Sequence, residues 1–371
     1  MRTRETGAPP GPSAPAGPPG PPNEPPAGSR PRPHRRRRVL AWVACGMAAL
    51  IVASGVTAYA AYRHLYGGIT TAPLHDLGHR PPKIGNAINV LVIGSDSRAG
   101  ENGAYGDEPG ARSDTILVMH IAAGGKRAVG VSLPRDSIVP IPACKVGGRT
   151  IPAHRGMINA SFNAGGAACT WKTVEATTGI HLDHFVQIDF AGFQKMVDAL
   201  GGIDIDVPRP VHDADAHLNL PAGHQRLDGR QALAYVRARH AFGDGSDLGR
   251  IKRQQQFMAA MIRKATSTDL LTNPVALYRF LDAATDSMTT DSGLDIGEMR
   301  RLAAGLSGMG SGAVRFVTVP NHPWPADPNR VQWTQPAAHH LFHRINADRP
   351  LPTSGPSASG PSATGPSAHG D

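Results

Sequence analysis

A long run of uncharged residues near the N-terminus is the feature that most constrains how this chain can fold. A run long enough to span a membrane places the residues before it and those after it on opposite sides of that membrane. The run, Val39–Tyr62, exceeds the roughly 20 residues that a membrane-spanning helix needs. The arginines directly before it, residues 35–38, predict a cytoplasmic N-terminus and an external C-terminal part. The alternative is a cleaved signal peptide, because Ala58-Tyr59-Ala60 resembles a cleavage site. Since signal peptides have a shorter apolar core of about 7–15 residues, we expect an uncleaved anchor.

Charge and composition separate the flanks of the chain from its body. The chain has 371 residues and a formal charge of +9, of which residues 1–38 carry +6 and the remainder only +3. The nearly balanced body argues against a nucleic-acid partner. Residues 1–38 are rich in Pro, Gly and Arg and are expected to be disordered in the cytoplasm. We further expect a linker at 63–86, a folded domain at 87–347 and a flexible tail of GPSA repeats at 348–371.

Cysteine usage is typical of a domain outside the cell. Cys45 lies inside the predicted membrane span. Cys144 and Cys169 remain as one pair in an oxidising compartment, so we predict a disulfide bond between them. Two free buried thiols are the alternative.

Three short apolar segments after the linker carry polar residues at one end. They cover residues 88–98, 112–121 and 128–136. If the three strands are neighbours that run up, down and up, Asp96, Asp114 and Arg135 meet at one edge of the sheet. Two carboxylates in one place need a compensating cation, so the pattern predicts a Mg²⁺ site. A role for each aspartate in a turn or cap is the alternative.

Strands and helices alternate through the middle of the chain. Residues 184–190 and 203–208 have the composition of strands, and residues 191–202 between them have the pattern of a helix that ends in Gly-Gly. The alternation predicts an α/β domain built on one sheet. Two histidine groups suggest zinc: His181 with His184, and His212 with Asp213, Asp215 and His217. Neither group has the spacing of a known zinc motif, so no zinc site is predicted.

The segment 231–256 combines arginines with a Gly-rich turn and reads as a strand, a turn and a helix. Arg237 and Arg239 are two residues apart, so on a strand they point to the same side. On the helix, three residues share a face: Asp247, Arg250 and Gln254. Two converging rows of guanidinium groups predict a site for a doubly anionic group such as pyrophosphate. A solvated charged helix is the alternative.

Six motifs in this order behind one membrane anchor resemble those of the LytR–CpsA–Psr family over about residues 86–345. They are IGSDSR, RSDTILV, VSLPRD, INASFNAGG, LDGRQALAYVRARH and SDLGRIKRQQ. The resemblance implies a mixed α/β sheet with helices on both sides and an apolar pocket for a polyprenyl chain. It also implies a Mg²⁺-dependent phosphotransferase that moves a glycopolymer from a polyprenyl-pyrophosphate carrier onto peptidoglycan. The alternatives are a protein that only binds lipid-linked precursors and a transcriptional regulator, but no helix-turn-helix pattern is present.

The resemblance further implies roles for individual residues. Asp96 and Asp114 would hold magnesium. The pyrophosphate would be approached by Arg98, Arg112 and Arg135, and its phosphates would be held by Arg237, Arg239, Arg250 and Gln254, with Asp247 orienting the arginines. The family usually has a basic residue before Ile158-Asn159, whereas this chain has Met157, and Arg155 is the expected substitute. Asp136 and Asp247 are the candidates for a general base.

Overall fold

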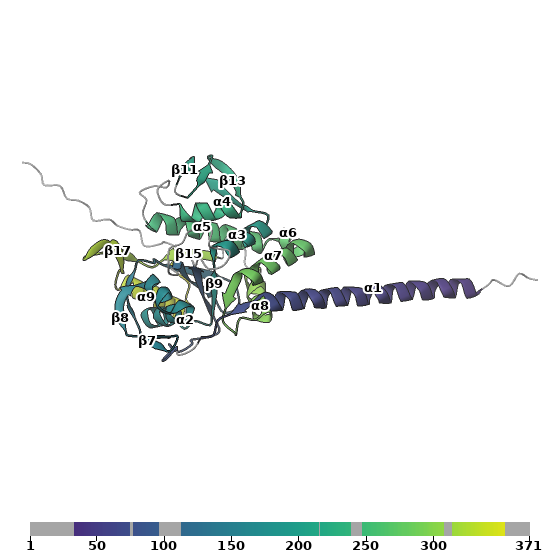
Figure 1. Ribbon diagram of the computed structural model, residues 1–371, viewed down its shortest axis with the longest axis horizontal. Coiled ribbons are helices and arrows are strands. Elements are labelled where there is room, and N and C mark those ends of the chain that lie inside the picture. The colour runs from purple at the N-terminus through teal and green to yellow at the C-terminus, as the bar shows by residue number, and fades with distance from the viewer. Residues whose placement is uncertain are drawn as a thin grey trace, which may run out of the picture. The chain divides into compact units, whose positions relative to one another are not determined.

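The computed structural model describes residues 33–74, 77–95, 113–214, 216–238, 247–307 and 314–352 (Figure 1). By its internal packing the chain separates into two units, Met1–Tyr59 and Ala60–Asp371. Helix α1 (Pro33–Gly68) begins in the first unit and is long and apolar enough to cross a membrane. It extends past both ends of the predicted span, 39–62.

A mixed sheet of seven strands forms the frame of the second unit, as far as the structure describes it. The strand order is β1–β14–β9–β2–β3–β4–β15. The bounds are β1 (Thr70–Thr71), β2 (Ile88–Ser95), β3 (Ser113–Ile121), β4 (Ala128–Leu133), β9 (His184–Ile188), β14 (Met288–Thr290) and β15 (Val314–Thr318). Strands β2, β3 and β4 are antiparallel neighbours, whereas β9 runs parallel to β2 and β15 runs parallel to β4. The predicted up, down and up order of the first three strands is confirmed.

Helices cover both faces of this sheet, as expected. Alternate residues of β2 point to opposite faces, so Leu91 and Ile93 belong to one core and Val90 and Val92 to another. The first core contains residues of α2 (Ile158–Thr178) and α9 (Ala337–Asn346), and the second is packed by residues of α5 (Asp247–Ala265) and α8 (Ile296–Ser307). A third core joins α5 to α3 (Phe190–Ala199), α4 (Gly229–Arg237), α6 (Thr268–Thr272) and α7 (Pro274–Ser287).

Further strands pair two by two outside the central sheet. The pairs are β5 (Ile138–Ile141) with β8 (His154–Met157), β6 (Cys144–Val146) with β7 (Arg149–Ile151), β10 (Ile203–Val207) with β13 (Gly223–Leu227), β11 (Val211–Asp213) with β12 (Leu218–Leu220), and β16 (Asn321–Trp324) with β17 (Asp327–Trp333). The predicted α/β domain on a mixed central sheet is confirmed, but the strand predicted at 203–208 does not join that sheet, because β10 pairs only with β13 among the described strands. Ile203, Ile205 and Val207 are buried and alternate with more exposed aspartates, which is typical of an antiparallel strand with one wet face.

The segment around Arg237 differs from the predicted strand, because residues 229–237 form helix α4. Asp228 is its N-cap and accepts a hydrogen bond from the backbone N–H of Gln231 at 2.8 Å. The Gln231 side chain accepts one in return from the Asp228 backbone N–H at 3.1 Å. This capping box satisfies two N–H groups at the helix start and favours a helix over the predicted strand. Arg237 consequently ends a helix and does not lie on the predicted strand, and Arg239 lies outside the described residues.

Packing extends beyond both ends of the predicted domain, 87–347. Thr70 and Thr71 form strand β1, which pairs with β14. The predicted tail begins at Asp348, whose carboxylate lies 2.5 Å from an Arg127 guanidinium nitrogen and 3.1 Å from the imidazole of buried His120. Part of the expected linker and the first residue of the expected tail therefore pack with the folded domain.

The two cysteines predicted to pair, Cys144 and Cys169, form a disulfide bond that joins β6 to α2. Their Cα atoms lie 5.6 Å apart and 25 positions separate them in sequence. Replacing both with alanine is expected to lower the free energy of unfolding by about 2–4 kcal/mol, because the unfolded chain regains the freedom of the closed loop. Thermal unfolding followed by circular dichroism should show a midpoint lower by several degrees. The control Cys45→Ala should not shift it, and an unshifted midpoint in the double variant would contradict this account.

Candidate active site

A cavity of about 260 Å³ lies between the C-terminal end of β2 and helices α3, α4 and α5. Most of its walls are aliphatic or aromatic, with contributions from Val92, Ile93, Ile188, Phe193, Leu233, Val236, Phe257, Met258 and Met261. Its polar lining includes Ser95, Asp114, Thr115, Arg237, Arg250 and Gln254. Apolar walls with a few convergent charged groups suit a ligand that has an apolar chain and an anionic head.

Helix α5 supplies both kinds of lining from one face. Arg250 and Gln254 are four residues apart, and Phe257, Met258 and Met261 follow within two further turns. Residues at these intervals lie on the same side of a helix, so the polar and apolar parts of the cavity are adjacent along α5. The predicted shared face of Arg250 and Gln254 is confirmed. Arg250 is only 3% exposed, so its charge is held within the protein.

Asp114 and Arg135 meet at one sheet edge, as the order of the first three strands predicts. Arg135 Nη1 donates a hydrogen bond to Asp114 Oδ1. The side chains are 17% exposed for Arg135 and 25% for Asp114, so the pair is largely shielded from water. Arg135 Nε also lies 3.5 Å from a carboxylate oxygen of Asp136. Because Asp114 lines the cavity, this ion pair brings both signs of charge to its polar part.

Arg237 reaches the cavity from the last turn of α4. Its guanidinium carbon lies 4.6 Å from the centre of the Phe190 ring. A cation over an aromatic face is attracted by the ring's electrons, so Phe190 orients Arg237 while leaving its N–H groups available for an anion. Sequence reasoning missed Phe190, although its place directly after the helix cap Asp189 marks it as the first residue of α3.

The remaining predicted site residues cannot be placed. Asp96, Arg98, Arg112 and Arg239 lie outside the described residues, and helix α5 begins at Asp247, whose side chain also lies outside them. The predicted pairing of Asp96 with Asp114 and the predicted orienting role of Asp247 therefore stay predictions.

Arg253 is a further residue of this region, and sequence reasoning assigned it no role. It is 7% exposed, and its Nη2 donates a hydrogen bond to the backbone carbonyl of Ala238. The neighbouring Gln254 donates to the carbonyl of Val236 at 3.3 Å. Two successive side chains of α5 thus hold the backbone on either side of Arg237. Burial lowers the pKa of Arg253, yet an arginine remains a cation at neutral pH.

Arg330 of strand β17 is a further cation, which lies beside Asp136 next to the Asp114–Arg135 ion pair. It lies 3.8 Å from Asp136 and 3.3 Å from Asp327, and its guanidinium contacts the sulfur of Met157. The hairpin that carries it is attached to the loop after β4, because the Val331 N–H donates to the Asp136 carbonyl at 3.2 Å. A cation from a distant segment therefore occupies the surroundings of Met157, whereas Arg155, the expected substitute, is exposed on β8.

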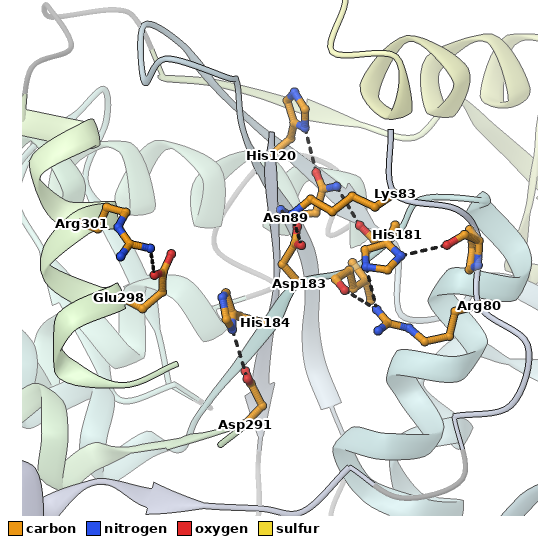
Figure 2. Close-up of polar contacts among 12 residues, drawn as sticks. Arg80, Lys83, Asn89, His120, His181, Asp183, His184, Asp291, Glu298 and Arg301 are labelled. Atoms are coloured by element: carbon orange, nitrogen blue, oxygen red, sulfur yellow. Dashed lines mark hydrogen bonds and ion pairs between the residues drawn. The ribbon is translucent and has the colours of Figure 1, made fainter. Parts of the chain in front are cut away.

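His181 and His184, one of the two histidine groups that suggest zinc in the sequence, contact separate partners in the structure. Figure 2 shows that His181 and His184 are directed at different partners. His184 lies 3.1 Å from the carboxylate of Asp291, and His181 contacts the carbonyl of Pro81 at 2.8 Å and Arg80 at 3.3 Å. Burial lowers the pKa of His184, but the hydrogen bond that His184 donates to Asp291 and the charge of Asp291 raise it more, so the net change is upward. Within the described ranges, no three side chains of His, Cys, Asp or Glu could together hold a metal ion.

A mixed sheet with helices on both faces is also the fold of solved bacterial enzymes. The LytR-Csp2A-Psr enzyme from Actinomyces oris superposes with a TM-score of 0.58 at 25% identity, over 75% of this chain and 96% of that one. The chain belongs to the LytR_cpsA_psr family, whose model matches residues 71–344.

Two curated relatives illustrate the similarity. The cell wall biosynthesis protein LcpA of Corynebacterium glutamicum is 32% identical over 68% of this chain and 54% of its own length. The polyisoprenyl-teichoic acid–peptidoglycan teichoic acid transferase TagU of Enterococcus faecalis is 32% identical over 58% of this chain and 64% of its own length. The match thus spans about half to two thirds of these relatives.

Proposed function

We propose that this protein is a membrane-anchored phosphotransferase that moves a glycopolymer from a polyprenyl-pyrophosphate carrier to peptidoglycan. The cavity carries this proposal, because apolar walls and the cations Arg237 and Arg250 line the same space. Apolar walls suit a polyprenyl chain, and arginines bind the oxygens of a pyrophosphate with paired, charge-assisted hydrogen bonds. The name of the Enterococcus faecalis relative describes a transfer of this class.

The proposed reaction exchanges the phosphoanhydride bond of the pyrophosphate for a phosphodiester bond to peptidoglycan. A peptidoglycan hydroxyl attacks the phosphorus that carries the sugar, and a new oxygen–phosphorus bond forms. The bond from this phosphorus to the bridging oxygen breaks, and polyprenyl monophosphate leaves with that oxygen. Arg237 and Arg250 stabilise the negative charge that is spread over the phosphate oxygens during transfer. The hydroxyl proton passes to a base, for which Asp136 and Asp247 stay the candidates.

We also propose that Mg²⁺ takes part in the reaction. Asp114 fits this ion, because its carboxylate lines the polar part of the cavity and Mg²⁺ prefers carboxylate, phosphate and water oxygens. Asp96 is the proposed second carboxylate. When bound, Mg²⁺ would neutralise charge on the phosphate oxygens. The adjacent Arg135 holds Asp114 in place through the ion pair described above.

The proposed location follows from the anchor. Helix α1 crosses the membrane with the arginine-rich N-terminus in the cytoplasm, which leaves the domain outside the cell. A lipid carrier in the same membrane then reaches the cavity by diffusion in two dimensions. Anchoring both partners in one bilayer raises their effective concentration and lowers the entropic cost of binding.

Transfer by the purified full-length protein in lipid nanodiscs tests the proposal. With a polyprenyl-pyrophosphate saccharide, peptidoglycan and Mg²⁺, we expect saccharide-modified peptidoglycan and one polyprenyl monophosphate per transfer. Chelation of Mg²⁺ with EDTA should stop the reaction, and added Mg²⁺ should restore it. Donor binding without release of polyprenyl monophosphate would indicate a lipid-phosphate binding protein instead. Undiminished transfer in EDTA would contradict the proposed role of Mg²⁺ and leave the proposed transfer reaction unaffected.

A further inference from the structure

Exposed apolar side chains gather where helix α6 leads into α7. Among the described residues outside α1, five large apolar side chains are exposed, and three of them belong to this region: Leu271, Val275 and Leu281. Val275, Tyr278 and Leu281 follow one another at intervals of three residues, so they form one row along α7. We call these four residues the apolar corner. Single exposed apolar residues are common, whereas a cluster of them indicates a binding surface.

The apolar corner lies apart from the face of α7 that packs on the domain. Ala276 and Phe280 are four residues apart and pack against the core that joins α5 to α3. Val275 is 59% exposed and Leu281 is 40% exposed. Asn273 caps the helix, because its side chain accepts a hydrogen bond from the Ala276 N–H at 3.1 Å. Helix α7 thus buries one apolar face in the domain and presents a second one to its surroundings.

The end of α1 that belongs to the second unit, residues 60–68, lies beside α7. His64 Nε2 is 3.1 Å from a carboxylate oxygen of Asp282, and a Cβ added at Gly68 would lie 2.7 Å from Oδ1 of Asp286. The two contacts are four residues apart on both helices, so α1 and α7 run in the same direction here. Going back along α7 from Asp282 therefore leads toward the apolar span of α1.

The apolar corner reaches the depth of the membrane surface. The apolar span ends at Tyr62, whose ring stacks on that of Tyr66 with the ring centres 6.2 Å apart, and tyrosines are enriched where membranes meet water. Each helical residue advances about 1.5 Å, so Val275 lies about 10 Å back from Asp282, and Tyr62 lies about 3 Å back from His64. Val275 is therefore roughly 7 Å deeper than Tyr62, within the roughly 5–10 Å that interfacial helices reach.

The register of the central sheet places the end of α1 on the same side of the domain as the cavity. Thr70, two residues after α1, pairs with Thr289 of β14. Thr289 pairs with Gln187 of β9, and Gln187 pairs with Ile93 of β2. Ile93 lines the cavity. The chain therefore passes from the anchor into the sheet at the level of the cavity.

The charges near the corner suit a lipid surface. From Leu270 to Leu281 the sequence has one charged residue, Arg279, and its side chain is exposed. An arginine can lay its aliphatic part along an apolar surface while its guanidinium reaches the phosphates of lipid headgroups. The nearest following carboxylate, Asp282, lies beside His64. A protein partner would not require the corner to coincide with the end of the membrane span, so its position favours lipid.

Helix α5 links the apolar part of the cavity to the corner. Met258 and Met261 of this helix line the apolar part of the cavity. Met261 packs against the same core as Ala276 and Phe280 of α7, and α6 begins three residues after α5 ends. Membrane contact at the corner would therefore bring the apolar part of the cavity close to the lipids.

We propose that the apolar corner inserts into the outer leaflet of the membrane beside α1, with Arg279 at the lipid phosphates. The inference rests on the proposed location, in which α1 crosses the membrane and the domain lies outside, and it does not depend on the transfer reaction. The corner gives the domain a second attachment besides α1 and keeps the cavity at the membrane surface. A lipid carrier then moves from the leaflet into the cavity without exposing its apolar chain to water.

A fluorescent label on the corner of the full-length protein tests the inference. Bimane is attached at Val275→Cys in a Cys45→Ala background, in which the other two cysteines are held in the disulfide bond. In nanodiscs of phosphatidylcholine with a minor fraction of phosphatidylglycerol, we expect quenching by lipids that carry a spin label high on the acyl chain. Iodide in the water should quench this label little. The same label at Ile84→Cys should show the reverse, because Ile84 precedes β2 at the end of the sheet opposite the cavity.

Substitutions in the corner show whether its apolar side chains cause the insertion. Adding Leu271→Gln and Leu281→Gln should reduce lipid quenching at position 275 by roughly half or more, because membrane binding scales with the buried apolar area. The matched control adds Ile84→Gln and Val146→Gln, which replace two exposed apolar side chains elsewhere, and should leave the quenching unchanged.

Two results would overturn the inference. Quenching at position 275 by iodide and not by the lipid labels would show that the corner lies in water. Protection from both quenchers would show that a protein surface, such as a second copy of the chain, covers the corner instead of lipid. These readings need no glycopolymer donor, so they stay separate from a failure of the proposed function.

Discussion

Replacing Arg237 with alanine is expected to lower kcat/KM for glycopolymer transfer by roughly 30- to 1000-fold. The estimate corresponds to about 2–4 kcal/mol of lost transition-state stabilisation, the usual effect of removing one group that contacts developing charge. Arg237 lies in the cavity lining and is oriented by the Phe190 ring. Its loss removes a cationic donor from the polar part of the cavity lining.

The measurement is release of polyprenyl monophosphate by the full-length protein under saturating and limiting donor. Arg237→Lys should recover only part of the rate, because an ammonium group lacks the planar fork that binds two phosphate oxygens at once. Arg230→Ala is a matched control on the same helix, since Arg230 is exposed near the opposite end of α4. Because the Arg237 side chain is exposed at the surface of the cavity, the thermal unfolding midpoint of the Arg237→Ala variant should differ little from that of the wild type. Wild-type kinetics in Arg237→Ala would refute the proposed role.

Arg253→Met is expected to reduce kcat by roughly 10- to 100-fold while the KM of the donor changes little. Arg253 lies outside the cavity lining, and it acts by holding the Ala238 carbonyl next to Arg237. Without this hydrogen bond the end of α4 can shift, and a displacement of about 1 Å of a charged group can cost roughly 100-fold in rate. Stability should also fall by about 1–3 kcal/mol, because a buried carbonyl loses its donor.

A double-mutant cycle distinguishes positioning from a general loss of stability. If Arg253 acts through Arg237, then adding Arg253→Met to Arg237→Ala should have little further effect on kcat. Fully additive effects on kcat would show that Arg253 acts independently of Arg237. Arg263→Met serves as the control, because Arg263 is exposed on the same helix.

Local patterns predicted the first part of the sheet correctly, and they failed where pairing depends on distant segments. Strands β2, β3 and β4 follow one another through short connections, so their polarity alone placed Asp114 beside Arg135. Strand β1 has only two residues, and its partner β14 lies more than 200 positions away, so no local signal marks it. A two-residue strand has no measurable alternation, and only the folded partner defines it.

The arginine-rich segment shows a different kind of error. The residues from Ala232 to Val236 form a short apolar run that predicts a strand, yet Asp228 and Gln231 stand at the spacing of a capping box. The capping box predicts the structure better than the apolar run does, because it satisfies backbone N–H groups that only the start of a helix leaves without hydrogen-bond partners. The contact of Arg237 with Phe190 and that of Arg330 with Met157 join separate segments, so spacing in the sequence could not predict either.

The short strand β1 determines where the chain can be cut without exposing an edge of the sheet. It begins two residues after α1 ends and is hydrogen-bonded into the sheet, with a further bond from the Ala72 N–H to the Thr290 carbonyl at 2.9 Å. The residues that follow α1 are thus held at the edge of the central sheet. Cutting the chain just before residue 87 would also strip an edge strand and leave the N–H and C=O groups of β14 open to pairing with other chains. A soluble fragment of this protein therefore keeps its native sheet edge only if it starts ahead of Thr70.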